Sequence, residues 1–196
     1  WEVLEETYYL GLQEAQLASL SIKDIALSLP QVLAFGREAR EILRKYKGRM
    51  YLLQAAKQQG TMQAAVDYAT EHTARRKAFG KVLAQFQAVS FRVSQTVIET
   101  KVVKNLILHA ASAVDQGKED AEQLALLAIH RAHEGLLYVT DSAVQLLGGH
   151  GFVQDYPVEK WMRDAQAQVL LYGDAAQFLQ ERGQELMKVF QTEVGI

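Results

Sequence analysis

The sequence predicts an all-α protein, an antiparallel four-helix bundle of long helices with an extra N-terminal helical segment. Apolar residues recur every three to four positions over long stretches, and strand-type alternation is almost absent. Only two prolines, Pro30 and Pro157, interrupt the 196 residues. Long amphipathic helices joined by short turns are typical of a bundle, because each helix buries its apolar stripe against its neighbours.

The first 29 residues are expected to form the separate helical segment. Leu4, Tyr8, Leu12 and Ala15 have the spacing of one helical stripe, and residues 21–24 interrupt it. We therefore expect residues 1–29 as the N-terminal helical segment and residues 30–196 as the bundle, with a boundary near Pro30.

Four long helices are expected in the bundle, at about residues 37–76, 85–116, 120–147 and 174–190. Gly48 and Gly60 are weak points of the first helix. Gly117 and Gly148 follow the second and third helices, where a glycine commonly ends a helix. Asp174 suits the N-cap of the fourth.

Composition narrows the function classes. With 49% hydrophobic and 22% charged residues, the chain resembles an ordinary soluble globular domain. Its net charge of -2 gives no electrostatic case for nucleic acid or an anionic membrane, and no apolar run reaches membrane-spanning length. The lack of cysteine excludes disulfides, thiolate zinc sites and cysteine nucleophiles.

The start of the chain is acidic, without methionine and unlike a signal peptide. We therefore interpret the chain as a fragment, a processed product or part of something longer. A bacterial cytoplasm or an organelle matrix is the expected location.

The residues by themselves indicate no catalytic or metal site. His130 and His133 share a helical face beside Glu134, but a metal site needs three or four convergent ligands, so no metal is predicted and these are interpreted as surface or satisfied helix histidines. No serine lies in a nucleophile-elbow pattern. The basic residues 72–77 are interpreted as a solvated helix end, where cations face the carbonyl dipole favourably.

Several motifs in a fixed order carry more information together. They are residues 68–82, which contain Arg-Lys-Ala-Phe-Gly, residues 86–91, the glycine loop 145–151, and residues 156–160 and 163–165. In this order and spacing they resemble the C-terminal helical domain of the acyl-CoA dehydrogenases, flavin enzymes that oxidise acyl-CoA thioesters to 2-enoyl-CoA. The resemblance covers about residues 48–190.

The resemblance implies an FAD site built across a subunit interface. It implies that Arg76 and Lys77 approach the FAD pyrophosphate, that Phe79 packs close by, and that Gln87 is the matching glutamine at the next helix start. The loop residues Gln145, Gly148 and Gly149 would lie against the dinucleotide of a partner subunit. Guanidinium and backbone N–H groups suit a pyrophosphate, and glycines permit its close approach.

The family's usual catalytic base does not match. The family pattern is Tyr-Glu-Gly-Thr-x-x-Gln, whereas residues 172–177 are Tyr-Gly-Asp-Ala-Ala-Gln. Gln177 fits and joins the expected cofactor-binding residues, but Gly173 occupies the base position. Some members carry the base before the first motif, and Met50 stands there. Asp174 is the remaining candidate base, although its position suits an N-cap.

Three functions follow from these expectations. The first is an FAD-binding and oligomerisation domain of an acyl-CoA dehydrogenase, which needs the missing N-terminal helical and β-barrel domains to act on acyl-CoA. The second is a catalytically inactive oligomerisation or regulatory partner of an active paralogue, and the third a helical scaffold without flavin. A homo-oligomer, dimer or tetramer, or a hetero-oligomer with a paralogue is expected, with Phe79, Phe86, Phe91 and the glycine loop at the interface.

Overall fold

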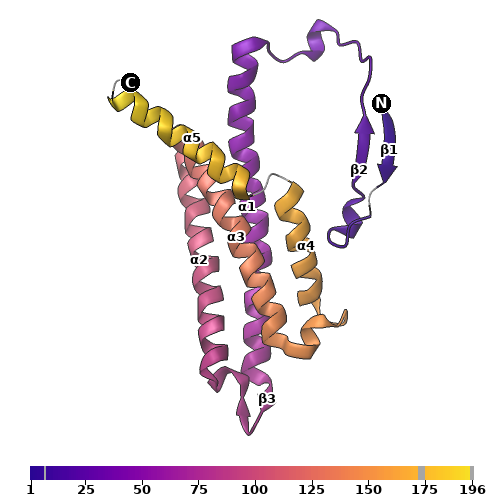
Figure 1. The fold of residues 1–196 in the computed structure, drawn as a ribbon, viewed down its shortest axis with the longest axis vertical. Helices are drawn as coiled ribbons and strands as arrows, with labels where there is room; N and C mark the ends of the chain where they lie inside the picture. The colour runs from indigo at the N-terminus through magenta and orange to yellow at the C-terminus, as the bar shows by residue number, and fades with distance from the viewer. Residues whose placement is uncertain (7, 172–174, 195–196) are drawn as a thin grey trace.

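The computed structural model describes residues 1–6, 8–171 and 175–194. Five α-helices make up most of this part of the chain (Figure 1). They are α1 (Gly36–Arg75), α2 (Gln87–Asp115), α3 (Ala121–Leu147), α4 (Pro157–Leu171) and α5 (Ala175–Val194). Two small antiparallel hairpins are formed by β1 (Glu2–Glu6) with β2 (Ala18–Ser21), and by β3 (Lys77–Ala78) with β4 (Lys81–Val82).

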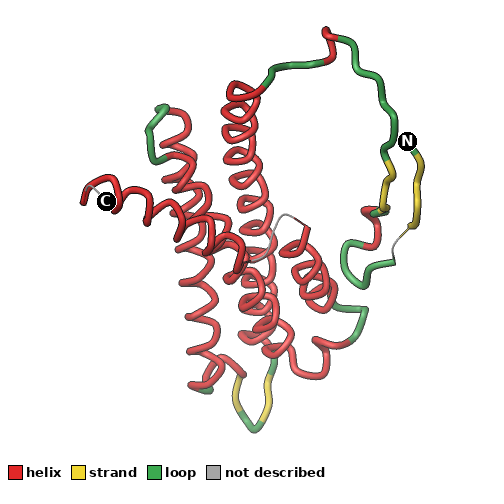
Figure 2. Tube along the Cα trace, turned by 45° about the horizontal axis from the view of Figure 1, so that its top comes forward, coloured by secondary structure: helices red, strands yellow, loops and turns green. Residues whose placement is uncertain are grey.

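Helices α1 to α4 run side by side, and each runs opposite to the one before it (Figures 1 and 2). Helix α3 is central, because it contacts α1, α2, α4 and α5. Helix α5 crosses α3 obliquely at the end of the bundle that carries the α2–α3 turn (Figure 1). The four long helices predicted from the sequence are confirmed as α1, α2, α3 and α5, with ends that differ by a few residues.

Small side chains bring the helices close together. Gly135 of α3 faces Met62 of α1 and Val103 of α2, and all three lie where these helices meet. Met62 and Val103 are fully buried. The surrounding core is rich in buried alanines, among them Ala55, Ala65, Ala125 and Ala132. Alanine suits such a core because it favours helix and occupies little space.

Helix α4 was not among the four long helices expected from the sequence. Pro157 is the first residue of this 15-residue helix. A proline suits that position because its missing N–H would have no partner in the first helical turn. The buried residues Val158, Ala165 and Val169 then place one face of α4 on the bundle.

The expectation of helical structure in residues 1–29 is wrong. Strands β1 and β2 pair there with a bulge between Val3 and Glu5, and Leu12 and Gln16 have positive φ. An isolated helix of this length is marginal and needs a surface on which to bury its stripe. The expected stripe is not buried as a whole, since Leu4 and Tyr8 are 62% and 78% exposed. Pairing of the two strands satisfies the backbone instead.

The boundary expected near Pro30 falls in a short 3₁₀ turn, Leu29–Gln31, and α1 begins at Gly36. Within the described ranges, the helices are all too short or too polar to span a membrane.

Candidate functional site

The β3–β4 hairpin follows α1 directly and presents two predicted site residues. Its two-residue loop, Phe79 and Gly80, has φ values of 51° and 83°, as a tight hairpin of this kind requires. The Phe79 ring is 95% exposed and meets Phe86 edge-on, with ring centroids 6.5 Å apart. Lys81 Nζ lies 4.1 Å from the centroid of the Phe86 ring. The hairpin therefore holds an aromatic side chain out into solvent.

The glycine loop turns the chain sharply between α3 and α4. Gly148 ends α3 with φ 59° and ψ -132°, a conformation essentially restricted to glycine. The 3₁₀ turn Gly148–Phe152 follows. A Cβ built on Gly151 would lie 2.3 Å from the carbonyl oxygen of Val144, so this turn packs backbone against backbone on the end of α3. The loop thereby places His150 opposite α1.

A cavity of about 430 Å³ lies between the end of α1 and this glycine loop. It is lined by His72, Arg76, Ala78, Leu83, Leu147, Gly149, His150 and Val153. None of these lining residues carries a carboxylate, whereas Arg76 brings a permanent positive charge. The cavity thus joins Arg76 and Gly149, two residues that the sequence motifs singled out separately, and its charge suits an anion.

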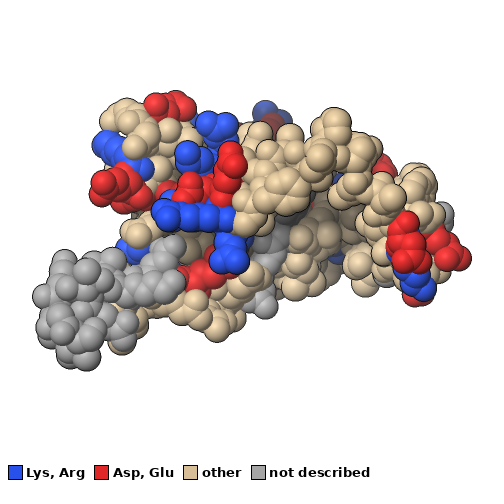
Figure 3. Space-filling model, turned by 90° about the horizontal axis from the view of Figure 1, so that it is seen from above, with Lys and Arg blue, Asp and Glu red and all other residues tan. Residues whose placement is uncertain are grey.

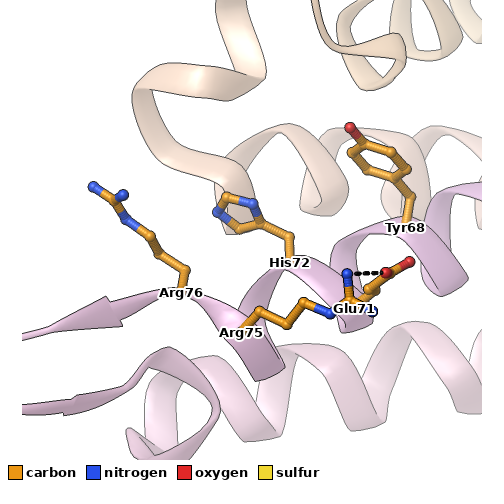
Figure 4. Close-up of a pocket in the computed structure, with 5 residues that line it drawn as sticks. All are labelled: Tyr68, Glu71, His72, Arg75 and Arg76. Atoms are coloured by element: carbon orange, nitrogen blue, oxygen red, sulfur yellow. Dashed lines mark ion pairs between the residues drawn. The ribbon is translucent and has the colours of Figure 1, made fainter.

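A second recess of about 360 Å³ lies beside it along α1, lined by Tyr68, Glu71, His72, Arg75 and Arg76. Glu71 and Arg75 form an ion pair of 2.7 Å, and Arg76 points away from this pair (Figure 4). The two neighbouring arginines therefore differ: Arg75 is paired with a carboxylate, whereas Arg76 lines the cavity described above.

His72 and His150 form a pair that sequence reasoning missed. Their ring centroids lie 5.9 Å apart, and the ring of His150 meets Tyr156 edge-on at 5.0 Å. Burial, followed by the charges of His150 and Arg76, lowers the pKa of His72. The sequence did hold one signal for His72. It precedes Arg76 by one helical turn, so the two side chains were to be expected on the same face of the chain. His150, inside the glycine loop, could only be placed by the fold.

The other predicted cofactor-binding residues lie outside the cavity. Lys77, Gln87 and Gln145 are exposed, and they belong to elements near the same end of the bundle (Figure 1). Gln177 is also exposed and its Nε2 donates to Glu181 Oε1 at 3.1 Å. It lies at the start of α5, near the middle of the bundle and away from the β3–β4 hairpin (Figure 1).

Of the three candidate base positions, the structure describes Met50 alone. Gly173 and Asp174 lie outside the described residues. Met50 lies in α1 and is 51% exposed.

The histidines on α3 have partners inside the protein. His133 is buried, its Nδ1 lies 3.1 Å from Gln58 Oε1, and its ring meets Phe178 edge-on at 5.1 Å. His130 Nε2 lies 3.8 Å from Glu134 Oε2. Within the described part of the chain, His, Asp and Glu side chains form no group of three or more that could hold a metal ion.

Charged side chains of both signs are interspersed over the end of the bundle opposite the hairpin (Figure 3). On the described residues of that end, neither sign of charge forms a broad region, which differs from the cavity with its single cation, Arg76.

Comparison with known proteins gives a consistent result. Residues 48–180 match the family model of the acyl-CoA dehydrogenase C-terminal domain. The chain is 31% identical over 160 residues to the short-chain-specific acyl-CoA dehydrogenase of Megasphaera elsdenii. The aligned segment covers 80% of this chain and 40% of that enzyme. It is 34% identical over 114 residues to a subunit of the caffeyl-CoA reductase–Etf complex of Acetobacterium woodii, covering 58% of this chain and 30% of that subunit.

Among solved structures, butyryl-CoA dehydrogenase from Megasphaera elsdenii superposes with a TM-score of 0.87 at 27% identity. The match covers 93% of this chain and 48% of that enzyme. The chain therefore spans less than half the length of these relatives.

Proposed function

Because the chain belongs to the acyl-CoA dehydrogenase family, we propose that it is the FAD-binding helical part of a flavin-dependent acyl-CoA oxidoreductase. The observation that carries this proposal is the cavity shared by Arg76 and Gly149. Members of the family are FAD-dependent flavoproteins. FAD, when bound, supplies the hydride acceptor for acyl-CoA oxidation.

The residues of the cavity fit a dinucleotide. Arg76 offers a guanidinium that can donate two parallel hydrogen bonds to phosphate oxygens. Gly149 leaves the backbone accessible, because a Cβ added there would meet nothing within 4 Å. Leu83, Leu147 and Val153 supply apolar walls that exclude water from one side of the ligand. We assign Lys77, Gln87 and Gln145 to outer contacts at the same end, and Gln177 to a separate contact near α5.

The chain spans less than half the length of the relatives it matches, so we assign the chemistry on acyl-CoA to an enzyme that also has the parts this chain does not match. The β1–β2 hairpin supports this division. A two-stranded hairpin alone is marginally stable, yet this one exposes Trp1, Leu4, Leu20 and Ile22, each more than half exposed. We propose that it continues a sheet formed by the rest of the protein.

Self-association is part of the proposal. Phe79 is 95% exposed and Phe91, in the first turns of α2, is 67% exposed. Large aromatic side chains at the surface are typical of protein interfaces. We propose that a second copy, or a paralogue, covers them and closes the FAD site. A relative that is itself a subunit of a complex supports such assembly.

A second function is favoured by one observation, the residues at the base positions. By the motif resemblance, Gly173 and about Met50 stand where the family carries glutamate, and neither side chain could accept the substrate proton. The chain would then serve as an inactive partner of an active paralogue. Dye reduction with a range of acyl-CoAs distinguishes the two functions, because only an active enzyme reduces the dye. If activity is found, Asp174→Asn tests Asp174 as the base, and this substitution should abolish the activity.

Binding of FAD to matched arginine variants tests the cavity. Arg76→Gln should weaken FAD binding at least tenfold, in line with the ~1.5–3 kcal/mol of a hydrogen bond to a charged group. Arg75→Gln is the control, because Arg75 is paired with Glu71. Both should unfold at the same urea concentration as the unmodified protein. Equal losses of affinity in the two variants, or no binding of FAD by the unmodified protein, would reject the assignment.

A further inference from the structure

The cavity contains a titratable feature that the proposed function does not use. His72 of α1 and His150 of the glycine loop both line it, with Arg76 one helical turn beyond His72. Their ring centroids are 5.9 Å apart, close enough for the charge of one imidazole to act on the other. Two elements far apart in sequence therefore converge on the cavity with an imidazole each.

The charged groups around this pair are unbalanced. Arg76, directly after α1, lines the cavity with the pair, and Tyr156, directly before α4, packs on His150. Glu71 and Arg75 share the neighbouring recess with Tyr68 but are occupied with each other at 2.7 Å. Lys77 of β3 is exposed. Among the residues that line the cavity, a proton added to either imidazole therefore meets positive charge and no carboxylate. The pKa of His72 is lowered, first by burial and then by the charges of His150 and Arg76.

An anion in the cavity reverses this balance. A dinucleotide carries two phosphate groups, each with one negative charge, and Arg76, the permanent cation among the residues that line the cavity, offsets one of them. A protonated imidazole would offset the second, and its positive charge would then be favoured instead of opposed. The two positive charges, on Arg76 and on the imidazolium, would then equal the two negative charges of the phosphates.

We propose, building on the function proposed above, that the His72–His150 pair is a proton-coupled phosphate contact of this site. One proton is taken up by the pair when the diphosphate of the dinucleotide binds. FAD is therefore held more tightly as the pH falls, and the second phosphate is recognised by an imidazolium beside the guanidinium of Arg76.

Calorimetric titration of the protein with FAD tests this directly. The diphosphate of FAD is esterified at both ends, and its one strongly acidic hydroxyl per phosphorus stays ionised between about pH 5 and 8, where histidine titrates. Any proton exchange in that range therefore belongs to the protein. Titrations in buffers of different ionisation enthalpy should show uptake of up to one proton. The dissociation constant should rise with pH by at most about tenfold per pH unit, the limit for one coupled proton.

His72→Gln and His150→Gln should each reduce this proton uptake and flatten the pH dependence while leaving FAD binding measurable at high pH. The control is His109→Gln, because His109 is exposed on α2 and does not line the cavity. If one variant of the pair fails to fold, the other decides the question. Thermal unfolding identifies that case.

Two outcomes overturn the inference and are distinct from one another. FAD binding with the same affinity at all pH values, and with no proton uptake, refutes the coupling but leaves the proposed function intact. Failure to bind FAD at any pH refutes the proposed function, and the coupling with it.

Discussion

The backbone N–H of Leu12 donates a hydrogen bond of 2.7 Å to Asp164 Oδ1, which joins residues 152 positions apart. The other carboxylate oxygen of Asp164 accepts from Lys160 Nζ at 2.7 Å. Next to them, the guanidinium of Arg163 donates to the carbonyl oxygen of Leu10. Gly11 packs so closely that an added Cβ would lie 2.1 Å from the carbonyl oxygen of Arg163. These contacts fasten the N-terminal hairpin to α4.

Asp164→Ala should release this attachment. Asp164 is 8% exposed, and loss of its hydrogen bonds should cost ~1–3 kcal/mol locally. Residues 8–15 should exchange amide hydrogens faster, while the exchange of α3 stays slow. Asp164→Asn, which keeps an acceptor oxygen, is the control and should have a smaller effect. Unchanged exchange in residues 8–15 would show that Asp164 does not hold the hairpin.

Phe178→Ala should detach α5 from the bundle. The side chain is 1% exposed and meets Tyr51 edge-on at 5.3 Å and His133 at 5.1 Å. Removing a buried phenylalanine costs ~3–5 kcal/mol, which urea unfolding can measure. Leu179→Ala is the matched control, because Leu179, the next residue along the chain, is 58% exposed and should contribute little to the free energy of unfolding. Similar losses in both variants would contradict the assigned role of Phe178.

Gly148→Ala and Gly149→Ala should separate backbone strain from ligand contact. Gly148 has φ 59° and ψ -132°, so alanine there should cost ~1–3 kcal/mol of stability. Gly149 has no positive φ and open space around it, so Gly149→Ala should leave stability unchanged but add a methyl group to the cavity. Urea unfolding and FAD titration measure the two effects. The expectation fails if Gly149→Ala is the more destabilising change.

Stability should fall as the pH is lowered through the ordinary histidine range, in part because of His72. The folded state lowers the pKa of His72, mainly by burial, so below about pH 6.5 the unfolded chain binds a proton more readily than the folded one. The stability contributed by neutral His72 is therefore present above that pH and lost below it. His72→Gln should weaken the pH dependence of urea unfolding, whereas His109→Gln should not. Identical slopes for both variants would argue against this role.

Phe79→Ser with Phe91→Ser should reduce self-association. Both side chains are largely exposed, so their replacement should leave the stability of the single chain within about 0.5 kcal/mol. Light scattering over a range of concentrations should show smaller particles than for the unmodified protein. Leu33→Ser, at an 89% exposed position before α1, is the control and should change nothing. An unaltered particle mass would place the interface elsewhere.

Local patterns in the sequence predicted most of the helices. The stripe through Val89, Val93 and Val97 and the glycine at Gly117 are signals that neighbouring residues supply, so α2 could be placed within a few residues. Pro157 is ambiguous at this level, because the same residue begins turns and helices. Only burial of Val158 and Ala165 against the bundle decided for a helix.

The N-terminal segment shows the opposite case. Leu4, Tyr8, Leu12 and Ala15 have helical spacing, but spacing predicts a helix only where a surface exists to receive the stripe. In the structure the partner of β1 is β2, and the loop between them rests on α4. A contact between residues 12 and 164 leaves no trace in either local sequence.

The sequence by itself determined the bundle and the family, and it singled out Arg76, Gly148 and Gly149 as candidate binding residues, because helical periodicity and short motifs are properties of neighbouring residues. Only the tertiary structure decided that Arg76 shares a cavity with Gly149, that Gln177 lies away from it, and that His72 meets His150. The reason is physical: a binding site depends on the distances between helices. Packing of the helices sets these distances, and the local sequence of one helix does not reveal them.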